Sequence, residues 1–387
     1  MKTKDFSIIL GVLLVCYMYV CDIANFAGLQ SVLLINTAGR APLLTAAVAL
    51  CFFRLILEKI TIERVAFTAF IFGLYMFVIG FNNKGEATMA AFISCVIYWA
   101  VLLAIFRGVK LQEKTKNKII TMCACTSILI SLIYIYGLIT LDTKTVGFSN
   151  SIYVVLCSTV FGFIVERKTL RIVLLVTASA AILFSAKTTC IVALIIVLLY
   201  FFWEQIFNKK NKHTFAVILV GIIGFLVINK AYEIFFAGSE SLYEALVNDL
   251  QEDFSGGNGR YNIYIKVWRA FKESSFIQVM FGHGYNAVTN YVGIGAHNDF
   301  LQVVFDYGVT GLFLYFAFWI QLIKEAVLVK KSGQDCRAYV ISLLIFLCLS
   351  MASNVINSQI QMMFLVMFWG INKYTKNNER YLQHAKV

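Results

Sequence analysis

His297 and Asn298 stand directly before a long apolar run of the chain, residues 299–322. A histidine can accept a proton near neutral pH. The first turn of a helix offers unpaired N–H groups and a partial positive charge, which suit a phosphate group. The arrangement therefore indicates either a proton acceptor beside an anion site or an ordinary polar cap at the start of a packed helix.

Three further residues of this run bear on the same question. Gly308 and Gly311 are three residues apart, a spacing that lets a neighbouring helix approach closely. We therefore expect the start of the helix to be held rigidly. Asp306 lies seven residues after Asp299 and so on the same helix face. An acidic residue at membrane depth either has a functional role or accepts a hydrogen bond within the bundle, and both readings stay open.

The elements that must position these residues are strongly apolar. Hydrophobic residues make up 60% of the 387 and charged residues only 14%, with a single proline. Soluble domains are about half apolar and about a quarter charged, so the composition predicts an all-α polytopic membrane protein. A helix needs roughly 20 apolar residues to cross the hydrocarbon core, which gives about 12 transmembrane helices. The predicted spans are 6–22, 41–57, 65–81, 87–106, 119–139, 151–165, 170–186, 188–203, 214–230, 299–322, 338–354 and 359–372.

The basic residues predict the orientation of the chain. If the N-terminus is cytoplasmic and the spans alternate, most of the 33 lysines and arginines fall in cytoplasmic loops. This is the positive-inside pattern. We therefore expect both termini in the cytoplasm, and the net charge of +12 reports orientation and not a nucleic-acid partner.

One loop is far longer than the others and divides the chain into three parts. Residues 1–230 hold the first nine or so spans, residues 231–298 form a large extracytoplasmic loop, and residues 299–387 hold the last three or so spans and a cytoplasmic tail. In the loop, apolar residues recur at helical spacing in "SLYEALVNDLQEDF" (241–254) and in "RYNIYIKVWRAF" (260–271). The spacing predicts two amphipathic helices that lie on the bilayer surface.

The pattern H-N-x9-G-x2-G, formed by His297, Asn298, Gly308 and Gly311, resembles the signature of the O-antigen ligase and O-antigen or capsule polymerase superfamily. Three upstream fragments are similar to further elements of that family. "GHG" (282–284) resembles its F-G-x-G element, "GGNGR" (256–260) its glycine-arginine element, and "LFSAKTT" (183–189) a helix-end element. The last has Lys187 where an arginine is more usual. The resemblance covers roughly residues 140–320 and implies a GT-C-like fold.

The resemblance also implies a reaction. A sugar chain carried on undecaprenyl diphosphate is transferred to an acceptor hydroxyl on the outer face of the bacterial cytoplasmic membrane. His297 would be the base for that hydroxyl. Arg260 and Lys187, with Arg269 as a helper, would hold the departing diphosphate. Arg269 beside lipid headgroups is the alternative reading. Asn298 and the glycines would support the site.

Fixed cations of this kind can take the place of a metal ion. The outward segments contain no D-x-D, and His283 and His297 have no third ligand at a suitable spacing. We therefore expect a metal-independent glycosyltransferase without a cofactor.

Three functions fit the sequence to different degrees. The first is a polysaccharide polymerase that joins lipid-linked repeat units of an O-antigen or capsule. The second is an O-antigen ligase that moves the finished chain to lipid A–core, and the motif does not separate these two. A flippase or transporter of lipid-linked oligosaccharide is less well supported, because the distinctive polar residues gather at the outer face and no internal repeat is visible. Expected partners are the lipid-linked oligosaccharide, membrane lipid, a chain-length regulator and a flippase.

Overall fold

A computed structural model places most of the chain. The residues that it describes are 3–29, 40–56, 63–80, 100–109, 111–141, 145–207, 244, 247, 260–333, 335–356 and 359–373. Every regular element within these ranges is a helix, as the composition predicts.

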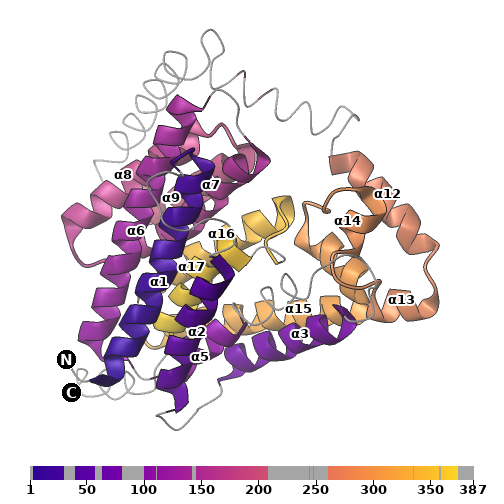
Figure 1. Ribbon diagram of the computed structural model, residues 1–387, viewed down its shortest axis with the longest axis horizontal. Helices are drawn as coiled ribbons and strands as arrows, with labels where there is room; N and C mark the ends of the chain where they lie inside the picture. The colour runs from indigo at the N-terminus through magenta and orange to yellow at the C-terminus, as the bar shows by residue number, and fades with distance from the viewer. Residues whose placement is uncertain are drawn as a thin grey trace.

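The elements follow one another along the chain as α1 (Thr3–Phe26), α2 (Arg40–Ile56), α3 (Arg64–Gly80), α5 (Leu102–Gly108), α6 (Glu113–Thr140), α7 (Val146–Ser158), the 3₁₀ helix η3 (Thr159–Phe163), α8 (Lys168–Phe184), α9 (Thr188–Phe207), α12 (Arg260–Lys272), α13 (Phe276–Phe281), α14 (Ala287–Val292), α15 (Asp299–Lys331), α16 (Arg337–Ala352) and α17 (Gln359–Ile371). Figure 1 shows their arrangement.

Three of these helices are long and apolar enough to cross a membrane: α1 from Asp5, α6 and α15. Shorter apolar helices of 10–17 residues lie within α2, α3, α7 with η3, α9, α16 and α17. The predicted span at 214–230 lies outside the described residues, and so does most of the span at 87–106. The described part of the chain is therefore all-helical and includes helices suited to span a membrane, and the predicted count of twelve spans stays a prediction.

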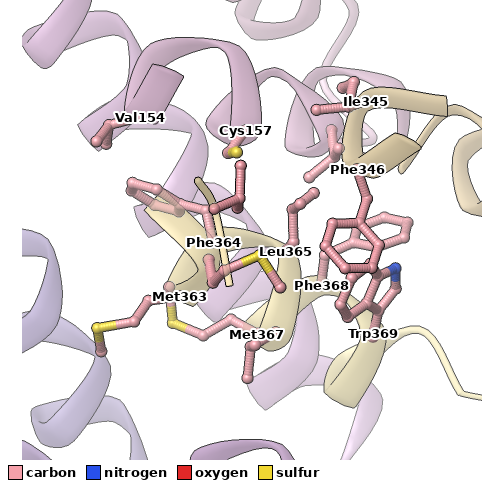
Figure 2. Close-up of a cluster of buried hydrophobic side chains, with 14 of the residues drawn as sticks. Val154, Cys157, Ile345, Phe346, Met363, Phe364, Leu365, Met367, Phe368 and Trp369 are labelled. Carbon is pink, nitrogen blue, oxygen red and sulfur yellow. The ribbon is translucent and has the colours of Figure 1, made fainter. Parts of the chain in front are cut away.

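Helix α17 lies at the centre of the bundle. Its side chains from Met362 to Trp369 are all fully buried. A helix that is apolar on every side must be surrounded by other helices, and Figure 2 shows α17 side chains between those of α7 and α16. Phe364 stacks on Tyr19 of α1 at a ring distance of 4.3 Å, and Trp369 meets Phe346 of α16 at 5.3 Å. The central helix therefore holds α1, α7 and α16 in place.

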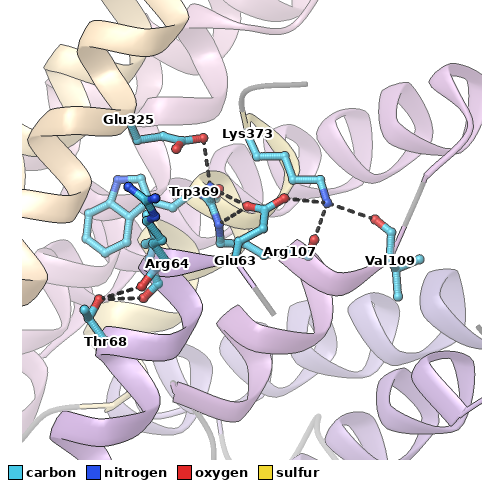
Figure 3. A network of polar contacts seen from close by, with 9 residues as sticks. Glu63, Arg64, Thr68, Arg107, Val109, Glu325, Trp369 and Lys373 are labelled. Carbon is cyan, nitrogen blue, oxygen red and sulfur yellow. Dashed lines mark hydrogen bonds and ion pairs between the residues drawn. The ribbon is translucent and has the colours of Figure 1, made fainter. Parts of the chain in front are cut away.

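A buried ionic network closes one end of the bundle (Figure 3). Arg107, only 1% exposed, lies 2.7 Å from Glu63 and 2.8 Å from Glu325, and its Nη1 donates to the Trp369 carbonyl at 3.0 Å. Lys373 lies 3.5 Å from Glu63 and also donates to the Arg107 carbonyl. Burial lowers the pKa of Lys373. Two cations and two acids balance here, which is how buried charges are tolerated. We call this region, around Glu63, Arg107 and Lys373, the charged end.

The short helices α12, α13 and α14 form a separate unit at the start of α15 (Figure 1). They share a small apolar core with α15, built on Ile263, Val267, Val288 and Phe305. The helix predicted within 260–271 is confirmed as α12. Of the other predicted amphipathic helix, only residues 244 and 247 are described, and both are helical.

Candidate functional site at the start of helix α15

Asn298 is the N-cap of α15. Its Oδ1 accepts the Leu301 N–H at 3.0 Å, which satisfies one of the free donors of the first turn. Its Nδ2 donates to the carbonyl of Met351, near the end of α16, at 3.3 Å. The residue therefore caps one helix and joins it to the end of another.

His297 adopts a left-handed backbone conformation, with φ of +50°. That conformation is uncommon for any residue other than glycine and is often found at functional positions. Its two neighbours are fixed: the Ala296 N–H donates to Gln302 Oε1 at 2.9 Å, and Asn298 is the cap. The imidazole itself is only partly buried. The backbone at His297 is therefore held in place, and the residue is partly exposed.

Asp306 organises the loop that leads to His297. It is fully buried, and its Oδ1 accepts the N–H of Val288, in the first turn of α14, at 2.9 Å. Its Oδ2 accepts from Gln302 Nε2 at 2.5 Å, and Gln302 in turn holds the Ala296 N–H. Of the two readings of Asp306, the structure favours the hydrogen-bonding one, because the carboxylate links α14, α15 and the His297 loop.

Asp299 plays a similar part toward the last two helices. It too is fully buried, and its Oδ1 accepts the N–H of Ile356, in the connection between α16 and α17, at 3.1 Å. Its Oδ2 accepts from the Tyr315 hydroxyl at 3.2 Å, and that hydroxyl lies 3.0 Å from Ser350 Oγ. The first residue of α15 thus ties the site to α16 and α17.

Helix α15 is kinked at Gly308, whose φ of 71° and ψ of −174° are not helical. Gly282, with φ of 88° and ψ of 178°, shares this conformation, which is essentially restricted to glycine. The two glycines pack backbone to backbone: a Cβ on Gly308 would lie 2.6 Å from the Gly282 nitrogen and 2.5 Å from the Met280 carbonyl. A Cβ on Gly282 would collide with the Asp306 carbonyl in the same way.

The kink frees carbonyl groups that the loop then satisfies. The Phe305 carbonyl accepts the His283 N–H at 3.1 Å, and the Asp306 carbonyl accepts the Gly284 N–H at 2.8 Å. The segment 281–284 is therefore fitted into the bend of α15. Two of the fragments singled out in the sequence, "GHG" and the paired glycines of α15, meet in space.

A helix approaches closely at both glycines, α13 at Gly308 and α3 at Gly311. A Cβ on Gly311 would lie 3.3 Å from a ring carbon of Tyr75 in α3, and the Tyr75 hydroxyl donates to the Tyr307 carbonyl at 2.8 Å. At Gly308 the close neighbour is the backbone of Met280, in the last turn of α13, together with Gly282 directly after that helix. Gly308 permits both a bend and the close approach of α13, and Gly311 permits packing against α3.

His283 is engaged within the protein through both ring nitrogens. Nδ1 lies 3.0 Å from the Phe305 carbonyl, and Nε2 lies 2.9 Å from Ser274 Oγ. The ring also stacks on Phe305 at 4.1 Å. Within the described part of the chain, no three His, Cys, Asp or Glu side chains gather as a metal-binding group.

Lys187 lies between α8 and α9. The packing of α9 against α16 shows at which end of the helix bundle the lysine lies. Arg337, the first residue of α16, lies 5.9 Å from the ring of Phe201 late in α9. Helices α9 and α16 pack together, and Cys190, early in α9, lies within electrostatic range of Cys348, late in α16. Both pairs fit one antiparallel register, because each step along α9 matches an equal step back along α16.

Lys187 lies three residues before Cys190, and Met351 lies three residues after Cys348. The antiparallel register therefore brings Lys187 level with Met351, the residue whose carbonyl accepts a hydrogen bond from Asn298. The lysine is partly buried, and its Nζ lies 5.8 Å above the ring centre of Tyr153 in α7. Lys187 therefore belongs to the end of the bundle at which α15 begins.

The structure separates the other two cations that the sequence grouped together. Arg260, the first residue of α12, is partly buried and shares a face with Ile263 and Tyr264, which pack against the small core. Arg269 is exposed and lies nine residues further, about half a turn away around the helix. The structure therefore does not place Arg269 on the face that carries Arg260, and its position suits the headgroup reading.

Sequence reasoning did not assign a role to Gln302 or Tyr315, and it left Asp299 without one. A signal was available, because Asp299, Gln302 and Asp306 are spaced three and four residues apart on an otherwise apolar helix. Such a polar stripe marks a face that must find hydrogen-bond partners inside the protein. No comparable pattern in the sequence indicates a role for Tyr75.

Comparison with known proteins adds one finding. Residues 173–316 match the family model described as O-antigen ligase. The matched stretch runs from α8 into α15 and holds Lys187, Arg260 and His297, and it lies within the range over which the motifs resemble that family. No curated protein matches the chain.

Proposed function

Because residues 173–316 carry an O-antigen ligase domain, consistent with the O-antigen ligase and polymerase superfamily, we propose that this membrane protein is a polysaccharide polymerase. Members of the family are glycosyltransferase-like enzymes. The proposed reaction moves a sugar chain from undecaprenyl diphosphate to the acceptor hydroxyl of a lipid-linked repeat unit, in an O-antigen or capsule pathway.

His297 is the proposed general base. The acceptor oxygen attacks the anomeric carbon of the donor sugar, its proton passes to the imidazole, and the bond from that carbon to the diphosphate breaks. A base must reach the reacting hydroxyl and keep a fixed position. The support is geometric: the imidazole is partly exposed, while the backbone on both sides is held by Gln302 and by the Asn298 cap.

Arg260 and Lys187 are the proposed partners of the diphosphate. Negative charge builds up on the leaving group as the bond breaks, and fixed cations stabilise it without a metal ion. The planar guanidinium of Arg260 suits two oxygens at once, and Lys187 supplies a point charge. Lys187 lies level with the His297 loop, and Arg260 lies on the inner face of α12, in the unit that packs on the start of α15.

The surface of the α12–α14 unit supports a site at the bilayer boundary. Tyr261, Trp268, Phe276 and Ile277 are all more than half exposed to solvent. Large exposed apolar groups gathered on short helices fit the interface of a membrane. We place this unit at the extracytoplasmic face of the bacterial cytoplasmic membrane and both termini in the cytoplasm, following the distribution of basic residues.

One observation carries the proposal. The two glycine elements that resemble the family signature lie far apart in sequence, yet Gly282 and Gly308 pack directly against one another. Their contact bends α15 at Gly308, nine residues after the start of the helix at Asp299. A merely structural cap would not need a glycine-only bend in both segments.

The family description favours one second candidate, an O-antigen ligase that transfers the chain to lipid A–core. The two functions share the donor and differ in the acceptor. Purified protein is therefore given lipid-linked repeat units alone, and then the same donor with lipid A–core. Polymer from repeat units alone supports the polymerase. Product that forms only when lipid A–core is present replaces it with the ligase.

A further inference from the structure

A groove unrelated to the α15 site lies between the start of α6 and the turn that leads from η3 into α8. Its volume is about 660 Å³. The residues that line it are Lys114, Asn117, Lys118, Ile120, Thr121, Met122, Val165, Glu166 and Arg167. Apart from its three cations, the groove is lined in equal parts by apolar residues (Ile120, Met122 and Val165) and polar residues (Asn117, Thr121 and Glu166).

The groove opens at the charged end of the bundle. Thr115, in the first turn of α6, donates to Asp5 of α1 at 2.8 Å, so both helices begin together. The cavity next to it is lined by Glu113 of α6 and by Asn372, directly after α17. Because α17 ends beside Lys373 and Arg107, the start of α6 lies at the end opposite to His297. This is the end that the basic residues predict to be cytoplasmic.

Three cations surround the mouth of the groove. Lys114 and Lys118 are one turn apart on α6, and Arg167 lies across from them at the N-cap of α8; all three are exposed. The single acid among the lining residues, Glu166, accepts a hydrogen bond from Asn117 Nδ2 at 2.8 Å. The lining residues therefore carry a net charge of about +2, which favours an anion.

An apolar track continues from the cations along the outside of α6. After Lys118 and Met122, the side chains of Leu129, Leu132 and Tyr136 follow at spacings of three, four and seven residues, and each of the last three is 45–49% exposed. Helix α8, which packs beside α6, is also exposed through its apolar side chains at Ile172 and Val176. Outward apolar side chains of this kind face acyl chains in a spanning helix.

We infer that this groove binds one anionic phospholipid. Its phosphodiester pairs with Lys114, Lys118 and Arg167, and an acyl chain lies along the track on α6. Basic pockets between helices on the cytoplasmic side are suited to acidic headgroups. A free phosphate would gain the charges but nothing from the apolar track, so the ligand is the lipid.

The test uses the full-length protein in nanodiscs that contain equal amounts of phosphatidylglycerol and phosphatidylcholine. Native mass spectrometry then counts the lipids that the released protein retains. The wild type is expected to retain phosphatidylglycerol in preference to phosphatidylcholine. Replacing Lys114, Lys118 and Arg167 together by glutamine should weaken that retention about fivefold per cation, on the order of a hundredfold for all three. Equal retention of the two lipids by the wild type overturns the inference.

A matched control removes the same charge elsewhere. Lys324, Lys330 and Lys331 are exposed residues in the last part of α15, and their joint replacement by glutamine should leave retention unchanged. An equal loss from this control shows only general attraction of acidic lipid and overturns the site. If the triple variant at the groove does not fold, Lys118→Gln alone should still lower retention about fivefold.

A second variant separates lipid from free phosphate. Thr121→Trp fills the groove without any change of charge, so it should abolish preferential retention of phosphatidylglycerol. Glycerol 1-phosphate, added at millimolar concentration to the wild type, should not displace the lipid. Displacement by glycerol 1-phosphate, or normal retention by Thr121→Trp, overturns the assignment of the groove to a lipid.

Discussion

Replacement of Gly308 by alanine tests whether the bend in α15 builds the site. The backbone at φ of 71° and ψ of −174° is essentially closed to alanine, and residues forced into such regions cost about 1–3 kcal/mol. The added methyl would also lie 2.5 Å from the Met280 carbonyl, and overlaps of this kind cost about 1–3 kcal/mol more. Alanine restricts the unfolded chain and returns about 0.4–1 kcal/mol.

The net cost is therefore about 1–6 kcal/mol. If this cost falls on the assembled site, the population with the correct bend drops roughly fivefold to 10⁴-fold, at about 1.4 kcal/mol per factor of ten. The assay is transfer by the purified protein from a lipid-linked donor, with the thermal midpoint in detergent measured in parallel. We expect transfer to fall by that factor.

Gly293→Ala is the matched control. Gly293 also has a positive φ, of 86°, but no atom lies within 4 Å of a Cβ built there. The free-energy cost of Gly293→Ala should come from the left-handed backbone conformation alone, about 1–2 kcal/mol. If Gly308→Ala lowered transfer no more than Gly293→Ala does, the contact between Gly308 and the 280–282 segment would have no part in the site, and the reasoning above would be refuted.

Three other predictions follow from the same contacts. Asp306→Asn turns one acceptor oxygen into a donor that faces its glutamine partner, so the thermal midpoint should fall with a cost of about 1–3 kcal/mol; an unchanged midpoint in a detergent melt would contradict a structural role for the hydrogen bonds that link Asp306 to Val288 and Gln302. Arg107→Ala removes the buried cation that pairs with both Glu63 and Glu325 and should destabilise the fold by about 3–5 kcal/mol, which the same melt measures. A loss of less than about 1 kcal/mol would contradict this prediction. Arg260→Lys should lower the transfer rate about 10²–10³-fold. By contrast, Lys187→Arg should retain most of the activity, and Arg269→Gln should change it little. Equal transfer rates for Arg260→Lys and Arg260→Ala would show that Arg260 does not bind the diphosphate.

Local patterns in the sequence predict much of the secondary structure, because helix formation depends on residues that are close together in the chain. Helix α12 follows from its apolar spacing, and the start of α15 follows from a polar pair before an apolar run. The helical class follows from composition. The length of α15 was underestimated, because Lys324, Lys330 and Lys331 extend the helix beyond its apolar run.

The parts that could not be predicted depend on contacts between distant segments. Tyr75 reaches the Tyr307 carbonyl across 232 residues of sequence, and no local pattern announces such a pair. The bend at Gly308 could not be predicted for the same reason. Spacing alone indicates that a neighbouring helix comes close, but the bend depends on the position of Gly282, which is distant in sequence.

The central claim is that His297 accepts the proton of the acceptor hydroxyl, and the most direct measurement is the transfer rate of His297→Ala. The assay uses purified protein in nanodiscs with a lipid-linked repeat unit and follows the chain ladder over time. A general base contributes about 10²–10⁴-fold, so the variant should transfer that much more slowly, with an unchanged thermal midpoint and unchanged donor binding. A rate within about tenfold of the wild type would show that His297 only turns the chain into α15, and the proposed mechanism would be contradicted.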